Sequence, residues 1–433
     1  MSNPLSKPLK LPCGAVLSNR LAKAAMSEGL ADSSNQSSTR LETLYLRWAN
    51  SGAGLLLSGN MQVDCMHLER PGNIVIDGRG QEQLSRLAEA GKFYGAHFWA
   101  QISHTGRQVN SHINSAPLSP SAVDIDVIRE AGFNFATPKP MTKWEIRNAI
   151  DQFIAGAKQV KEAGFTGLSL HAAHGYLISQ FLSPLSNRRT DRWGGSLENR
   201  SRFLLEVIAG IREVVGPKFP IGIKLNASDF QKGGFTNTEC VELVKLLNEV
   251  GIDLLELSGG SLEQPKVVGI SMKDEGEDGP RSSTIAREAY FVSFAGTVRQ
   301  VAKMPVMVTG GFRTMAGMVE ALENGELDIV GLGRPLIVAP DCPRRLLAGE
   351  VERLPSPELT MNLFHILPWN NMQLGYMGDG LNPALSLRGD VALKRFIQIE
   401  GRNMANLLEN PIYRTKKQQY LLQSNHALGP CRG

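Results

Sequence analysis

Eight short apolar runs recur along the chain, and none of them alternates as a half-buried strand would. They lie at residues 21–27, 53–60, 97–103, 167–174, 220–228, 254–260, 304–310 and 328–333. Continuous apolar runs are typical of strands buried on both faces of a parallel sheet. Segments with apolar residues three and four positions apart, such as 149–163 and 202–215, separate most of the runs and indicate helices. Eight strand–helix units predict an α/β chain folded as a (β/α)8, or TIM, barrel.

The length and the spacing of the runs refine this expectation. A Rossmann-type open sheet is the alternative, but no Gly-x-Gly-x-x-Gly motif follows the first run. A chain of 433 residues accommodates one large barrel and an extension. We predict a barrel at 1–350, with an excursion at 110–142 between the third and fourth strands, and a helical C-terminal extension at 351–433. The extension carries aromatic residues that could cover the barrel or a second copy of the chain, whereas the acidic loop 273–279 should face solvent.

Composition limits the kind of partner. The net charge of +4 is small and no dense Lys/Arg block is present, which argues against a dedicated nucleic-acid binder. No apolar run reaches the roughly 18 residues of a membrane span, and the first residues lack an apolar signal core. The cysteines are few and far apart, so neither a zinc finger nor an iron–sulfur cluster is expected. We therefore predict a cytoplasmic protein without a metal site; the cysteines are Cys13, Cys65, Cys240, Cys342 and Cys431.

The fourth run ends in the group of residues with the most chemical character. His171 and His174 lie three residues apart and Tyr176 follows them, at the point where a barrel strand gives way to its loop. Two imidazoles can bind and polarise one carbonyl or nitro oxygen, and a phenol beside them can give up a proton. The pair could also bind zinc, but no carboxylate at helical spacing completes such a site. One histidine here would more often be structural, whereas two with a tyrosine favour a functional site.

The same stretch resembles the signature of the Old Yellow Enzyme family. After His-Ala-Ala-His-Gly-Tyr-Leu come Phe-Leu-Ser-Pro at 181–184, Asn-Arg-Arg-Thr-Asp-Arg-Trp-Gly-Gly-Ser at 187–196 and Glu-Asn-Arg at 198–200. The resemblance extends over about residues 5–348. It implies FMN held without a covalent bond, hydride from NADH or NADPH, and reduction of an electron-poor alkene by the flavin. It further implies that His171 and His174 hold the substrate's electron-withdrawing oxygen and that Tyr176 protonates the α-carbon.

The resemblance also assigns residues to the flavin ring. Gln101 lies in a Gln-x-x-His-x-Gly-Arg motif, and its amide, both donor and acceptor, suits the pyrimidine edge of the ring. Ala25, Met26 and Ser27 end the first run, where the family lines the face and edge of the flavin, with the Ser27 hydroxyl near O-4. Gly59 ends the second run and permits close backbone approach to the ring.

Lys224 ends the fifth run and has three possible roles. In the family a cation at this position lies beside flavin N-1 and O-2, where reduced flavin gathers negative charge. A buried lysine at a strand end could instead form a Schiff base in an aldolase. A purely structural role would pair it with Asp229 or Glu256.

The last two runs are followed by a candidate phosphate site. Loops after strands seven and eight commonly bind phosphate in this fold, because glycines let backbone N–H groups approach the anion. Here Gly310 and Gly311 follow the seventh run, and Gly333 and Arg334 follow the eighth. Arginine adds a charged fork for the phosphate oxygens. Together with Gln101 and Lys224, these residues indicate FMN.

Some positions depart from the family pattern. Ala25 replaces a usual proline, and the first-strand loop lacks the tyrosine that some bacterial members use, which leaves the substrate range open. The missing cysteine cluster argues against the larger iron–sulfur relatives. Three functions are possible, and an FMN-dependent ene-reductase is the leading one. The second is a flavin-free lyase or aldolase that uses Lys224. The third is a non-catalytic small-molecule or flavin-binding protein, which would have no need of an intact set of two histidines and a tyrosine. A homo-oligomer is possible.

Overall fold

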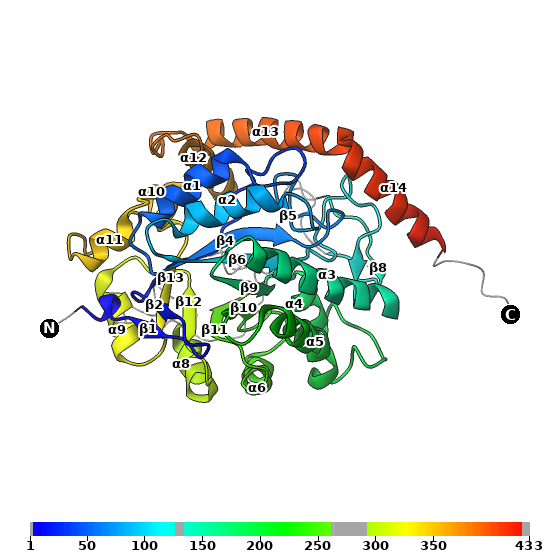
Figure 1. Cartoon of the computed structure of the whole chain (residues 1–433), viewed down its shortest axis with the longest axis horizontal. Coiled ribbons are helices and arrows are strands. Elements are labelled where there is room, and N and C mark those ends of the chain that lie inside the picture. Colours follow the sequence, from blue (N-terminus) through cyan, green and yellow to red (C-terminus); the bar gives the residue numbers. More distant parts are fainter. Residues whose placement is uncertain (1–2, 126–133, 261–262, 264–291, 427–433) are drawn as a thin grey trace.

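Eight parallel strands close into a barrel in the computed structural model, which describes residues 3–125, 134–260, 263 and 292–426 (Figure 1). Each strand pairs in parallel with its neighbours, and β3 closes the ring by pairing with both β13 and β4. Every predicted run overlaps one of these strands, so the predicted barrel is confirmed. The strands are β3 (Leu21–Lys23), β4 (Leu55–Gln62), β6 (His97–Ser103), β9 (Gly167–Ala172), β10 (Ile221–Asn226), β11 (Leu254–Ser258), β12 (Val306–Thr309) and β13 (Ile329–Leu332).

Helices follow the strands and surround the barrel (Figure 1). The helix expected at 149–163 begins earlier, because the Thr142 side chain and Glu145 form a reciprocal capping box that starts α3 at Lys143. Between strands the described helices are α1 (Thr39–Ala49), α2 (Gln81–Lys92), α3 (Lys143–Glu162), α4 (Leu177–Leu182), α5 (Leu197–Val215), α6 (Asn237–Leu247), α8 (Val292–Val301) and α9 (Met315–Glu323). After β13 come α10 (Pro335–Val338) and α11 (Cys342–Leu347).

An apolar plug fills the N-terminal end of the barrel interior. Trp99 on β6 is fully buried at its centre, and it fits because Gly167 and Gly222 on the next two strands have no side chains. A Cβ at Gly167 would lie 2.5 Å from the indole nitrogen. The helix η1 (Pro4–Ser6) begins the described chain, and the hairpin of β1 (Leu9–Lys10) and β2 (Val16–Leu17) adds apolar residues to this cluster. Polar side chains can therefore enter the interior only above the plug, towards the carboxyl ends of the strands.

The excursion predicted at 110–142 contains a small sheet. Here β7 (Leu118–Ser119) pairs in parallel with β8 (Lys139–Pro140), and Asn110 forms an isolated bridge with Phe135. Nearby, β5 (Ile74–Val75) lengthens the barrel sheet beside β4. The acidic loop 273–279 lies outside the described residues.

A helical extension follows the barrel, as predicted. It comprises η4 (Pro357–Thr360), α12 (Leu363–Gly378), α13 (Gly389–Glu409) and α14 (Pro411–His426). The helix α12 packs between α1 and α13, and α13 runs along one side of the molecule to α14 (Figure 1). Tyr413 and Tyr420 of α14 donate hydrogen bonds to the carbonyls of Ile113 and Ala116 in the excursion. None of the described helices is long and apolar enough to cross a membrane.

Candidate active site

His171 and His174 meet at the carboxyl end of β9, with their ring centroids 5.0 Å apart. His174 adopts a left-handed backbone conformation, with φ of 60°, which is uncommon for a residue other than glycine. Two amides hold this turn: the His174 N–H donates to Asn226 Oδ1 at 3.1 Å, and Gln108 Nε2 donates to the His174 carbonyl at 2.8 Å. The structure thus uses a strained turn to place the second imidazole beside the first.

Both histidines are neutral in this environment. Burial lowers the pKa of His171 and of His174 well below the ordinary value, and the nearby Lys224 ammonium lowers both further. His171 Nδ1 accepts the Ala173 N–H at 3.3 Å, so its Nε2 carries the proton. His174 Nε2 lies 2.7 Å from Ser258 Oγ, and either atom can donate the hydrogen bond between them. His171 can therefore present its Nε2–H to an oxygen atom, and His174 can present Nδ1–H in the tautomer that accepts the Ser258 proton.

Tyr176 lies against the same pair of histidines. Its ring centroid is 4.7 Å from that of His171, with the two planes nearly perpendicular. Burial raises the pKa of Tyr176 well above its ordinary value, and the Glu69 carboxylate raises it further, whereas the Asn60 side chain opposes the shift. The phenol therefore stays protonated at neutral pH, as a proton donor must.

Lys224 forms a buried ion pair on the neighbouring strands. Its Nζ lies 3.1 Å from Glu256 Oε1, and both side chains are almost fully buried. Thr309 Oγ1 donates to the same carboxylate oxygen at 2.6 Å. Of the two structural partners considered, the structure shows Glu256; Asp229 instead accepts from Asn226 and from the Phe235 N–H. A Schiff-base lysine must present a free amine, and an ammonium held by a buried carboxylate is poorly suited to that role.

The side-chain amide of Gln101 is suited to binding a ligand. It is 1% exposed, and its Nε2 has no hydrogen-bond partner among the described residues. An orphaned buried donor is costly unless a ligand or water satisfies it. Asn60 on β4 is the register partner of Gln101, and its Oδ1 is likewise buried without a hydrogen-bond partner among the described residues. The two side chains fit the alternating donors and acceptors of a flavin pyrimidine edge.

The candidate phosphate residues lie at the ends of β12 and β13. Gly310 and Gly311 have φ of 115° and 83°, which favour glycine, and a Cβ on Gly310 would meet no atom within 4 Å. Arg334 is partly exposed, and Glu358 of the extension lies 3.7 Å from it. The same carboxylate binds Arg313 at 2.6 Å. An open glycine backbone beside a guanidinium fits a phosphate group.

The end of the first strand closes the site between β4 and β13. The Met26 sulfur would lie 3.8 Å from a Cβ at Gly333, and Ser27 Oγ donates to Glu69 Oε2 at 2.6 Å. A Cβ at Gly59 would lie 2.1 Å from the Glu28 carboxylate. The first-strand loop therefore approaches Gly59 closely, and the expected approach of the flavin ring to Gly59 stays a prediction. Ala25 is partly buried and packs on the barrel plug.

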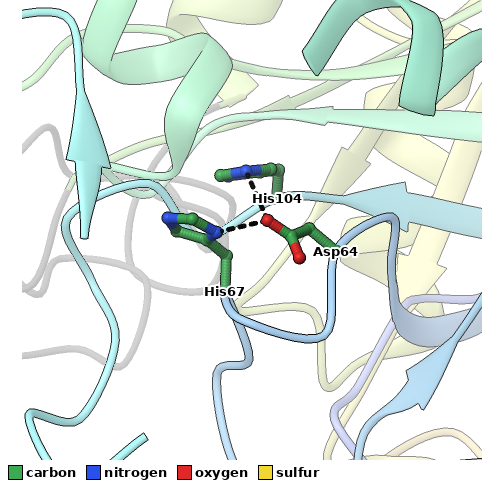
Figure 2. Close-up of side chains that lie close together, drawn as sticks. All are labelled: Asp64, His67 and His104. Atoms are coloured by element: carbon green, nitrogen blue, oxygen red, sulfur yellow. Dashed lines mark hydrogen bonds and ion pairs between the residues drawn. The ribbon is translucent and has the colours of Figure 1, made fainter. Parts of the chain in front are cut away.

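Asp64, His67 and His104 form a cluster in the same loops (Figure 2). His67 Nδ1 lies 2.7 Å and His104 Nε2 3.9 Å from Asp64 Oδ2. Backbone N–H groups donate to the other nitrogen of each ring, from Leu118 to His67 and from Gly106 to His104. The nitrogens that face Asp64 therefore carry protons rather than lone pairs, which opposes metal binding. The arrangement fits a structural role.

Three carboxylates at the site were not singled out from the sequence as site residues. Glu69 lies in the loop after β4, Glu256 was considered only as a structural partner of Lys224, and Glu358 lies in the extension. Glu256 and Ser258 lie two positions apart in β11 and therefore share a strand face, which offered a signal for Glu256. Glu69 and Glu358 lie in irregular segments without a recognisable motif, and only the fold brings them to the site.

A barrel whose carboxyl end combines neutral imidazoles, a phenol, a buried cation and a glycine–arginine pair defines a class of flavin-dependent oxidoreductases. The model of the NADH:flavin oxidoreductase / NADH oxidase family matches residues 4–352, and the chain belongs to this family. The NADH-dependent flavin oxidoreductase iliE of Neonectria sp. is 36% identical over 360 residues, which cover 78% of this chain and 46% of the relative. The chain thus spans about half the length of that relative.

Solved structures agree with this assignment. A 2-naphthoyl-CoA reductase in complex with 2-naphthoyl-CoA superposes with a TM-score of 0.75 and 26% identity, covering 90% of this chain and 58% of the other. An Old Yellow Enzyme homologue from Zymomonas mobilis shares the fold, with a TM-score of 0.67 and 23% identity over 82% of this chain and 95% of the other. The family resemblance and the expected cofactors, FMN and a nicotinamide nucleotide, are confirmed.

Proposed function

We propose that the chain is an FMN-dependent ene-reductase that uses NADH or NADPH to reduce the C=C bond of enones and related electron-poor alkenes. The observation that carries the proposal is the meeting of two neutral histidines with a protonated Tyr176 at the carboxyl end of β9. Bound FMN would supply the hydride, after receiving it from the nicotinamide. The substrate needs one oxygen held and one carbon protonated, and this triad offers the groups for both.

His171 and His174 would donate two hydrogen bonds to the substrate's carbonyl or nitro oxygen. Negative charge gathers on that oxygen when the β-carbon accepts hydride, so donors aimed at it stabilise the transition state more than the ground state. Because both rings are neutral, they bind the oxygen without giving it a proton. Tyr176 would then transfer its hydroxyl proton to the α-carbon.

The remaining residues would hold the cofactor. Gln101 would satisfy its buried amide on the pyrimidine edge, and Lys224 would place positive charge near N-1 and O-2. The first-strand residues would line the ring beside Gly59, and the phosphate would lie at the last two strand ends; these residues are Ala25, Met26, Ser27, Gly310, Gly311, Gly333 and Arg334. The division into a barrel at 1–350 and an extension at 351–433, the cytoplasmic location and a homo-oligomer stay predictions.

Tyr176→Phe tests the proposal by separating the two half-reactions. With the phenol removed, reoxidation of the reduced flavin by an enone should slow by about 100-fold or more, the usual contribution of a positioned general acid. Reduction of the flavin by NADH or NADPH needs no proton from Tyr176 and should be unchanged. Stopped-flow absorbance of the flavin measures both steps. Tyr94→Phe, at an exposed tyrosine, is the matched control.

Unchanged alkene turnover in Tyr176→Phe would remove this residue from the proton-donor role. A wild-type protein whose reduced flavin no enone reoxidises would overturn the ene-reductase proposal itself. Comparing NADH with NADPH in the first half-reaction identifies the hydride donor.

A further inference from the structure

Ser258 ends β11, and its hydroxyl contacts the imidazole of His174. The distance between Ser258 Oγ and His174 Nε2 is 2.7 Å, although the two residues are 84 positions apart in the sequence. Ser258 is fully buried, and its carbonyl accepts the Ala227 N–H at 2.7 Å, which holds its backbone in the barrel. The hydrogen bond made by one ring nitrogen determines whether the other nitrogen carries the proton.

The two histidines of the site are held in different ways. His171 Nδ1 accepts a backbone N–H of its own turn at 3.3 Å, so the local chain sets its tautomer. In His174 the backbone is engaged instead, because Asn226 Oδ1 accepts its N–H and Gln108 Nε2 donates to its carbonyl. These two bonds hold the main chain of His174 but not its ring. In the part of the chain that the structure describes, the ring nitrogens of His174 bond only to Ser258.

The direction of this hydrogen bond follows from what each arrangement leaves unused. If His174 Nε2 donates, the Ser258 hydroxyl proton has no acceptor among the described residues, and Nδ1 presents a lone pair. That lone pair would repel a substrate oxygen. If Ser258 donates, its proton is used and Nδ1 keeps a hydrogen for the oxygen. Because unused donors in a buried site are costly, the second arrangement is favoured once an oxygen is bound.

We propose that Ser258 is the positioning residue of His174: by donating its hydroxyl proton to Nε2, it holds the imidazole as the Nδ1–H tautomer and leaves a proton donor for the substrate's oxygen. This inference rests on the proposed function and adds a residue to its site. Ser258 acts through His174, and no contact between its hydroxyl and the substrate is required.

The tautomer determines which ligands this position accepts. An Nδ1–H binds an oxygen that gathers negative charge, whereas an Nδ1 lone pair would bind the N–H or O–H group of a different ligand. A hydroxyl is suited to selecting the tautomer because it carries no charge. A carboxylate in the place of Ser258 would favour a second proton on His174. Ser258 therefore selects the position of the proton and keeps the ring neutral.

The direct test identifies the tautomer of His174 in the FMN-loaded enzyme without substrate. Nitrogen-15 NMR of histidine-labelled protein distinguishes a protonated ring nitrogen from one with a lone pair, and the His174 signals are those lost in His174→Ala. We expect the hydrogen on Nδ1 in the wild type and in Ser258→Thr, which keeps the hydroxyl. In Ser258→Ala the Nε2–H tautomer should gain a large share, because no hydroxyl then donates to Nε2.

Ser201→Ala is the matched control for removal of a buried hydroxyl. Ser201 is fully buried in α5, and its Oγ donates to the Leu197 carbonyl at 2.6 Å. The His174 signals of this variant should match those of the wild type. A hydrogen on Nε2 in the wild type would overturn the inference, as would a tautomer that stays the same in Ser258→Ala.

Binding of a phenol gives a second measurement, because its affinity should follow the fraction of His174 that keeps the Nδ1–H. Ser258→Ala should weaken binding by about 5-fold, the effect of one neutral hydrogen bond, and Ser258→Thr should restore it. The change in flavin absorbance measures the affinity. Adding Ser258→Ala to His174→Ala should cause no further loss, because the hydroxyl acts through that ring. Additive losses would overturn the positioning role.

The tautomer and the reaction are tested separately. If no enone reoxidises the reduced flavin even in the wild type, the proposed function fails. The NMR spectra of the wild type and of Ser258→Ala still decide whether Ser258 controls the proton of His174, because they are recorded without substrate.

Discussion

Removing Lys224 should destabilise the protein strongly, because its partner would remain as a buried, unpaired charge. The substitution Lys224→Met keeps the length of the side chain and deletes the ammonium. At 3.1 Å, the Nζ–Oε1 attraction is about 5 kcal/mol for an effective dielectric of about 20. Breaking a buried ion pair typically costs about 3–5 kcal/mol. The Thr309 hydroxyl still donates to Glu256, so we expect about 3 kcal/mol, at the lower end of that range.

A second substitution separates the charge effect from packing. In Lys224→Met/Glu256→Leu, both charges are replaced by apolar groups of similar size, and most of the lost stability should return, because such replacements are often neutral. The exposed pair Lys245–Glu242 on α6, with an N–O distance of 2.7 Å, is the matched control. Lys245→Met should cost less than about 1 kcal/mol, since solvent screens an exposed pair.

Urea unfolding of the cofactor-free protein, followed by circular dichroism, measures these free energies of unfolding. The reasoning is refuted if Lys224→Met costs no more than the control. It is also refuted if the double variant is less stable than Lys224→Met alone, because the leftover carboxylate would then not be the cause.

Two further predictions concern the imidazoles. His174→Ala should weaken binding of a phenol by about 10- to 100-fold, because one hydrogen bond to a charged or polarised oxygen is lost. The change in flavin absorbance on titration with the phenol measures this affinity. An undiminished affinity would exclude the contact between His174 and the oxygen. Asp64→Asn should lower the free energy of unfolding at neutral pH but not in strong acid. Burial opposes ionisation of Asp64, but His67 and His104 hold the pKa of this carboxyl below its ordinary value. The stability that Asp64 contributes is therefore present above the ordinary carboxyl range and is lost as the pH falls through the depressed value. Urea unfolding at several pH values checks this, and a constant difference between the two proteins would contradict it.

Local sequence was sufficient to predict the barrel. Each buried strand is an uninterrupted apolar run, and a strand flanked by helices has few alternatives to a parallel sheet. The ends of the runs also pointed to the site, because His171, His174 and Tyr176 are close in sequence and lie at the edge where a barrel carries its chemistry. What the runs could not predict is the backbone conformation of His174, which depends on Asn226 and Gln108 from elsewhere in the chain.

The carboxylates were harder to anticipate because their partners are distant in sequence. Glu69 accepts a hydrogen bond from Ser27, 42 positions away, and no periodic pattern marks the irregular loop that carries it. The pairing of Lys224 with Glu256 was more accessible, because both occupy inward-facing positions on adjacent strands and are register partners. A sequence pattern therefore predicts contacts along and between strands better than contacts between loops.

The extension adds contacts that the family resemblance does not contain. The family match ends at residue 352, whereas Glu358 binds Arg313 and approaches Arg334, and Glu400 binds Arg70. These carboxylates reach two sides of the site, the candidate phosphate end and the loop after β4. Since a carboxylate near Arg334 competes with a phosphate for the guanidinium, this environment should tune cofactor affinity in ways that the barrel alone does not. The resemblance thus carries over the reacting groups, while their electrostatic surroundings depend on residues outside the matched segment.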